Sequence, residues 1–142
     1  MPITVGTIVT IKSGGPNMTV TSIEKLPIIA KFKCTWFELE YGHFSSYQQG
    51  VSHFAELSLQ IVDITHLPEL IVFRNGETVQ LKSGGPVMTI KSIENSFIRC
   101  IWFNHSHQYH LQEADFPLGT LKRMPTENEH EHDPALYQQK PE

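Results

Sequence analysis

Apolar and polar residues alternate in several short stretches of the chain, and this period of two predicts β-strands. Residues 7–11 and 77–81 alternate in this way. A Gly-Gly-Pro break follows each of them, and residues 18–20 and 88–90 then resume the alternation with β-forming side chains. Because no stretch keeps a helical apolar period for more than two turns, the pattern predicts an all-β chain.

A third strand is predicted in each half, over residues 29–37 and 97–103. Alternation places Phe37 and Phe103 on the face opposite to three other side chains of the same strand. Those three are Phe32, Cys34 and Trp36 in the first half, and Ile98, Cys100 and Trp102 in the second. An aromatic residue on each face predicts a strand that is covered on both sides.

A last short strand is predicted in each half, at residues 59–62 and 120–123. Residues 53–59 and 112–116 are expected to form single helical turns. Several short strands separated by tight turns predict a small barrel of the SH3 type, whose closure also protects the exposed edges of the sheet.

The chain contains an internal repeat. Residues 12–20, Lys-Ser-Gly-Gly-Pro-Asn-Met-Thr-Val, recur at 82–90 with seven identities in nine positions. Further on, Cys-Thr-Trp-Phe at 34–37 is matched by Cys-Ile-Trp-Phe at 100–103. We therefore predict two tandem copies of one small module, each near the size limit for folding alone and stabilised by packing on the other.

The repeat predicts the domain boundaries. Residues 1–64 form the first SH3-like module, with a loop insertion near 38–53 where the two copies differ most. Residues 65–74 form a linker that is too apolar for a free spacer and is expected to pack into or between the modules. Residues 75–124 form the second module, and 125–142 a disordered acidic tail.

Charge is distributed unevenly along the 142 residues. The tail holds five acidic residues against Lys140, so it carries the whole net charge of −4 and leaves residues 1–124 neutral, with ten acids and ten bases. A neutral body lacks the basic footprint of a strong nucleic-acid binder. No apolar run is long enough to span a membrane, and the N-terminus lacks the features of a secretory signal, so a cytoplasmic location is expected.

Both halves resemble the YodC-like family of small uncharacterised bacterial proteins. The family pattern is Gly-x-x-Val-x-Leu-Lys-Ser-Gly-Gly-Pro-x-Met-Thr-Val followed by Cys-x-Trp-Phe. This chain matches it at Gly6, Val9, Ile11, 12–16, 18–20 and 34–37, and again at Gly76, Val79, Leu81, 82–86, 88–90 and 100–103. The resemblance implies the barrel fold and a bacterial or phage origin, but no activity, because the family has none assigned.

The two Gly-Gly-Pro turns are candidate phosphate sites. Successive backbone N–H groups can form an anion-binding nest, with a lysine beside it. The alternative is a structural turn, in which glycine supplies positive φ and proline fixes the bend. The candidate residues are Lys12, Ser13, Gly14 and Gly15 in the first copy, and Lys82, Ser83, Gly84 and Gly85 in the second.

Aromatic residues supply the candidate partner-binding positions. Aromatic side chains are favoured anchors of protein interfaces and can also stack on nucleic-acid bases. The alternative for the repeated pairs Trp36-Phe37 and Trp102-Phe103 is core packing, with one ring of each pair inside. Loop aromatics in the first-copy insertion are expected to be exposed contact residues, namely Tyr41, Phe44 and Tyr47.

Histidines provide a weak metal-site hypothesis. His105, His107 and His110 form a His-x-His-x-x-His cluster whose imidazoles can bind zinc, and the alternative is a polar loop. The two cysteines, Cys34 and Cys100, occupy equivalent positions and are expected to be buried thiols, since two are too few for a disulfide framework.

These features together predict a non-catalytic binding protein without a cofactor. The preferred function is protein interaction, as an adaptor, inhibitor or immunity-type module. A binder of nucleic acid or of a phosphate-containing small ligand, acting through the Gly-Gly-Pro loops, is the alternative, and a metal-dependent enzyme built on the histidines is a third. The chain carries no familiar enzyme motif, and the sequence leaves its oligomeric state open.

Overall fold

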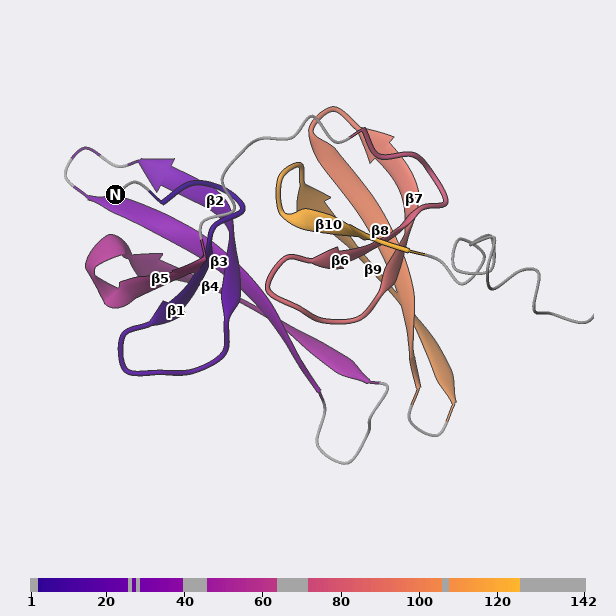
Figure 1. The fold of residues 1–142 in the computed structure, drawn as a ribbon, viewed down its shortest axis with the longest axis horizontal. Coiled ribbons are helices and arrows are strands. Elements are labelled where there is room, and N and C mark those ends of the chain that lie inside the picture. The colour runs from indigo at the N-terminus through magenta and orange to yellow at the C-terminus, as the bar shows by residue number, and fades with distance from the viewer. Residues whose placement is uncertain are drawn as a thin grey trace, which may run out of the picture.

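The computed structural model consists of two similar β modules joined by a connecting segment (Figure 1). The part of the chain that the structure describes contains ten strands and one short 3₁₀ helix. The structure describes residues 3–25, 27, 29–39, 46–63, 72–105 and 108–125. The predicted disorder of the acidic tail therefore falls almost entirely outside the described residues, as does most of the linker.

The first module is a five-stranded antiparallel sheet with the strand order β4-β3-β2-β1-β5. Its last strand follows η1 and returns to pair with the first. The elements are β1 (Ile8–Ile11), β2 (Met18–Lys25), β3 (Ala30–Leu39), β4 (Tyr47–Ala55), η1 (Glu56–Ser58) and β5 (Leu59–Asp63).

The second module repeats this arrangement, with the strand order β10-β6-β7-β8-β9. Its strands are β6 (Thr78–Leu81), β7 (Met88–Glu94), β8 (Phe97–His105), β9 (Tyr109–Pro117) and β10 (Leu121–Met124). A meander in which the fifth strand pairs with the first is the topology of a small SH3-like barrel. The predicted fold class, all-β with two tandem modules, is confirmed.

The fourth strand of each module was not expected from the sequence. Residues 112–116 lie within β9 rather than in a helical turn, and in the first copy only Glu56–Ser58 are helical within the predicted turn at 53–59. The reason is that β4 is an edge strand with mostly exposed positions, so it needs little apolar alternation. The loop insertion expected near 38–53 is therefore shorter than expected. Residues 40–46 connect β3 to β4, and residues 106–108 make the equivalent connection between β8 and β9.

Each module has its own apolar core, built from equivalent positions. Ile3 begins the first core and Phe73 the second, so Phe73 belongs to the repeat and not to a spacer. Arg123 fixes this end of the linker, since its guanidinium lies 5.5 Å from the Phe73 ring centroid and donates to the Val72 carbonyl at 2.7 Å. The described end of the linker therefore packs on the second module.

Cys34 and Cys100 are free thiols buried in the two cores, as the sequence indicated. Burial raises the pKa of each thiol to about 12 from its ordinary value of 9.0. A thiol whose pKa is higher in the folded state favours folding below pH 9 and loses that contribution as the pH rises toward 12.

We expect both thiols to resist alkylation at pH 8 in the native protein and to react within minutes once urea unfolds it. The thiolate is the reactive species, and burial both raises the pKa of each thiol and shields its sulfur from the reagent, so little reactive thiolate is accessible at pH 8. Timed iodoacetamide labelling followed by mass spectrometry measures this, with the fully unfolded chain as control. Fast native labelling of either cysteine would contradict the burial described above.

Candidate protein-docking surface

The two modules contact each other through different faces. Thr19 on β2 of the first module donates its hydroxyl to the Ser83 hydroxyl at 2.7 Å, and its Oγ1 accepts the Ser83 backbone N–H at 2.9 Å. Ser83 lies in the Gly-Gly-Pro loop of the second module. Thr19 is fully buried, so both of its bonds form away from water, where an unpaired hydroxyl would be costly.

Phe37 on β3 is the central apolar residue of this contact. Its ring lies edge-on to Trp102, with ring centroids 5.5 Å apart, and 6.3 Å from Phe116. A Cβ built on Gly85 would lie 2.5 Å from Cδ2 of Phe37, so the loop accepts this ring only because residue 85 is glycine. The first module thus inserts a side chain against the core of the second.

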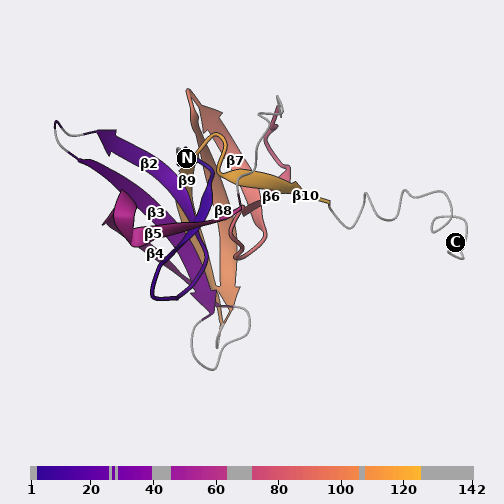
Figure 2. The same cartoon turned by 60° about the vertical axis from the view of Figure 1, so that its left-hand side comes forward.

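Two further contacts fix the relative orientation of the modules. The Asn104 side chain pairs with the backbone of Tyr47, accepting its N–H and donating to its carbonyl, each at 3.0 Å. Gly6 packs against the loop after β9, where a Cβ would lie 2.3 Å from the Gly119 carbonyl oxygen. The long hairpins β3–β4 and β8–β9 accordingly lie side by side, as the two views show (Figures 1 and 2).

Two names describe this interface. The aromatic face is the surface of a module formed by a threonine on its second strand, the phenylalanine of its Trp-Phe pair and the tyrosine opening its fourth strand. The loop face is the Gly-Gly-Pro loop with the Trp of the same pair and a phenylalanine of the fourth strand. The aromatic face of the first module (Thr19, Phe37, Tyr47) docks on the loop face of the second (82–86, Trp102, Phe116).

The aromatic face of the second module is exposed. Phe103 is 59% exposed, and neighbouring Tyr109 and Leu111 are 68% and 56% exposed. Phe103 and Tyr109 make an edge-on pair at 5.9 Å, close to the 6.3 Å between Phe37 and Tyr47. The expectation that this strand is covered on both sides therefore holds for the first copy and is wrong for the second, where no described residue covers Phe103.

The loop face of the first module is also exposed. Residues 12–17 of its Gly-Gly-Pro loop are all exposed, whereas 82–85 of the second loop are half-buried and Pro86 is buried. Trp36 and Phe54 are half-buried where Trp102 and Phe116 are buried. The covered state of the second loop face is thus a consequence of docking and not of the module's own fold.

The two tryptophans differ in their polar contacts. The Trp36 indole N–H donates to Glu38 at 3.0 Å. Among the described residues the Trp102 indole nitrogen has no hydrogen-bond partner, because Asn104, at the position of Glu38, bonds Tyr47 instead. An unpaired buried donor costs about 1–3 kcal/mol. In the docked second module, the bond from the Trp indole to the residue two positions on is therefore lost, and the bonds between Asn104 and Tyr47 of the other module take its place.

Backbone geometry explains the repeated Gly-Gly-Pro loops. Gly14 and Gly15 have φ of +107° and +133°, and Gly84 and Gly85 have +112° and +138°, values that other residues rarely adopt. The first glycine of each loop donates its N–H to the residue that ends the preceding strand, at 2.9 and 2.8 Å. The loops thus make the same bend in both copies, while the phosphate hypothesis stays untested.

The two candidate lysines of these loops have different surroundings. Lys12 is exposed, whereas Lys82 is half-buried and its Nζ lies 3.3 Å from the position of a Cβ on Gly6. This burial lowers the pKa of Lys82. The second loop therefore presents less of its lysine to solvent than the first.

The structure places the other candidate residues unevenly. Tyr47 is half-buried on the aromatic face, while Tyr41 and Phe44 lie outside the described residues, as does His107. His105 pairs with Tyr109 and His110 with Asn104 across the β8–β9 ladder, so the two imidazoles point to opposite faces. His105 stacks on Tyr109 at 4.3 Å, and the described residues contain no cluster of three metal-binding side chains.

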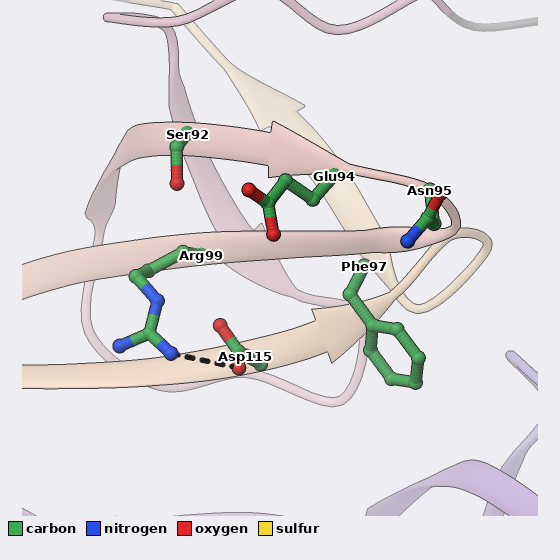
Figure 3. A pocket seen from close by; sticks show the side chains of 6 residues that line it. All are labelled: Ser92, Glu94, Asn95, Phe97, Arg99 and Asp115. Atoms are coloured by element: carbon green, nitrogen blue, oxygen red, sulfur yellow. Dashed lines mark hydrogen bonds and ion pairs between the residues drawn. The ribbon is translucent and has the colours of Figure 1, made fainter.

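A shallow hollow of about 180 Å³ lies at the turn between β7 and β8 (Figure 3). Arg99 and Asp115 pair at 3.0 Å across its floor, beside Glu94 and the half-exposed Phe97. Ligand sites are usually larger and more enclosed. A charged, open surface of this size fits the rim of a protein contact better than a small-molecule site.

Sequence reasoning missed Thr19 and Asn104 as interface residues. One available signal was the difference between the copies around Thr19. Thr21 and Thr35 are buried beside it, whereas the second copy has Lys91 and Ile101 at those positions. The second signal was the change from Glu38 to Asn104. Small uncharged side chains at one copy and a charged one at the other indicate which copy is covered.

Comparison with known proteins agrees with the repeat. A family model described as "Uncharacterized small protein (DUF2158)" matches residues 4–51 and again residues 74–121. Neither curated proteins nor solved structures gave a match. Within the described residues, no helix has the length and apolar character needed to cross a membrane. Since the two matched segments cover more than half of the chain, the protein belongs to this family and carries its domain twice.

Proposed function

We propose that the protein is a non-catalytic binding protein that holds another protein on the aromatic face of its second module. The supporting observation is that the same face of the first module already docks on a protein surface in this chain. The exposed face offers Phe103, Tyr109 and Leu111, and aromatic anchors carry much of the energy of protein interfaces.

The surroundings of this strip suit a protein partner. Lys91 and Arg99 pair with Glu113, and Arg99 also with Asp115, so both signs of charge border the apolar residues. Such pairs contribute little stability on a surface but can set orientation and partner choice. A rim of mixed charge is also a poor match for nucleic acid, which favours a basic face.

The same proposal includes the role of the protein, its source and its location. The role is that of an adaptor, inhibitor or immunity-type module, since each works by occupying another protein's surface. The resemblance to the YodC-like proteins supports a bacterial or phage source. A cytoplasmic location is proposed with it, and the exposed loop at Lys12 keeps phosphate binding as the alternative function.

Photo-cross-linking in the producing cells tests the proposal. We expect benzoylphenylalanine in place of Phe103 to capture a defined protein, identified by mass spectrometry. The control carries the same residue in place of Val62, which is 47% exposed on β5, outside both faces. Equal, diffuse labelling from the two positions, or none from position 103, would count against the proposal.

A further inference from the structure

We infer that copies of this chain associate head to tail, with the aromatic face of the second module of one copy docked on the loop face of the first module of the next. The inference rests on the proposed function and specifies its partner as a second copy. It starts from the observation that one aromatic face and one loop face are paired within the chain. The other face of each kind is exposed.

The exposed faces carry the residues that make the paired contact. On the aromatic face, Thr89 and Phe103 stand where Thr19 and Phe37 stand in the first module. On the loop face, Ser13 and Gly15 stand where Ser83 and Gly85 do, with Trp36 and Phe54 in place of Trp102 and Phe116. Each ring and each hydroxyl that makes the paired contact therefore has the same residue type at the equivalent position of the exposed faces.

The geometry of the exposed faces is preset for this contact. Gly15 has a φ of +133°, against +138° for Gly85, so the two loops bend alike. In the described chain the nearest atom to a Cβ on Gly15 is Cγ1 of Ile11 at 3.9 Å, whereas the same position on Gly85 meets the ring of Phe37. The space that Phe37 fills in the second module is therefore open in the first.

Burial shows what docking would change. Thr19 is fully buried while Thr89 is half-buried, and Phe37 is half-buried while Phe103 is 59% exposed. Docking a second copy would lower the exposure of Thr89 and Phe103 to that of Thr19 and Phe37. It would also cover Tyr109, which opens β9 and pairs with His105 on β8.

Two substitutions make the contact between chains weaker than the contact within the chain. Glu38 replaces Asn104, so it can accept the Tyr109 N–H but cannot donate to the Tyr109 carbonyl. Lys91 replaces Thr21, and its ammonium must stay hydrated or keep its pairing with Glu113. The linker also raises the effective concentration of the internal contact, which a separate chain lacks.

The symmetry of the contact limits the assemblies it can form. Because the two faces are different surfaces, the contact is heterologous, and repeated contacts either close into a ring of chains or extend into an open filament. Association then depends on the protein concentration. A chain lacking Phe103 can still bind another copy through its loop face but not through its aromatic face.

Cysteine pairing between separate full-length chains tests the inference. A Thr89→Cys chain is mixed with a Ser13→Cys chain under mild oxidation by diamide, at concentrations of 1 to 100 μM. The positions are chosen from the 2.7 Å contact between the equivalent Thr19 and Ser83 hydroxyls. We expect a covalent heterodimer from the mixture and much less dimer from either variant alone. Adding Phe103→Ala to the Thr89→Cys chain should lower the yield about tenfold.

The outcomes separate this inference from the proposed function. A mixture that yields no more dimer than the single variants, while Thr19→Cys/Ser83→Cys oxidises within one chain, would overturn head-to-tail association. Cross-linking from position 103 to a different protein would then leave the proposed function standing with another partner. If neither the cysteine pairing nor the photo-cross-linking gives the expected product, the head-to-tail inference and the proposed function are both contradicted. Sedimentation velocity of the unmodified chain gives a second measurement, since a constant monomer mass up to 100 μM contradicts the inference.

Discussion

Replacement of Phe37 with alanine should lower the free energy of unfolding by about 2–3 kcal/mol. The ring contacts Trp102 and Phe116 of the other module, and its removal leaves a cavity against a core. It should also uncouple the modules, so that a single urea transition broadens or splits in two. Urea denaturation followed by tryptophan fluorescence measures both effects.

Phe103→Ala is the matched control, because it makes the same substitution at the equivalent position of the other copy. Phe103 is 59% exposed, so at micromolar concentration its loss should change the free energy of unfolding by less than about 0.5 kcal/mol. Equal losses for the two variants would show that the faces of the two modules are occupied alike, against the arrangement described here.

The second large effect is expected from Gly85→Ala, with a loss of about 2–4 kcal/mol. A side chain there must adopt a φ of +138°, and its Cβ would fall 2.5 Å from Phe37. Gly15→Ala carries the same backbone strain, at a φ of +133°, but has no neighbour in the described chain closer than 3.9 Å. The difference between the two variants, about 1–3 kcal/mol, isolates the clash at the interface.

Thermal and urea unfolding of both glycine variants measure this difference. If Gly15→Ala lost as much stability as Gly85→Ala, backbone strain alone would explain both, and the contact between Phe37 and the second loop would contribute nothing. A Gly85→Ala/Phe37→Ala double variant provides the cycle, because removal of the ring removes the contacts at 2.5 and 2.9 Å and leaves only the Cβ of residue 37, at 3.0 Å.

Much of the fold was predictable because the signals are local. Alternating residues, repeated glycines and the matched Cys-x-Trp-Phe segments indicate strands and bends directly, and the duplicated block indicates two copies. The edge strands β4 and β9 were missed because they are mostly exposed and their solvent-facing positions accept polar residues. These edge strands are held by antiparallel backbone pairing with β3 and β8, and a pattern of side chains does not predict such pairing.

The docking surface was only partly predictable, for a different reason. Phe37, Trp102 and the second Gly-Gly-Pro loop were candidates, but their counterparts in the other copy carry the same residue types. Identical residues cannot indicate which of two aromatic faces meets which of two loop faces. That choice depends on the residues that differ, such as Asn104, which bonds Tyr47 of the first module, against Glu38, which bonds Trp36 of its own module.

The most direct test of this account is disulfide formation within single chains at high dilution. The Thr19→Cys/Ser83→Cys chain should form an intramolecular disulfide rapidly, while the Ser13→Cys/Thr89→Cys chain should stay reduced, because only the first pair of positions is in contact. Mass spectrometry of the trapped thiols distinguishes the two results. Closure of the second pair at high dilution, or failure of the first to close, would contradict the docking of the two modules on which the proposals depend.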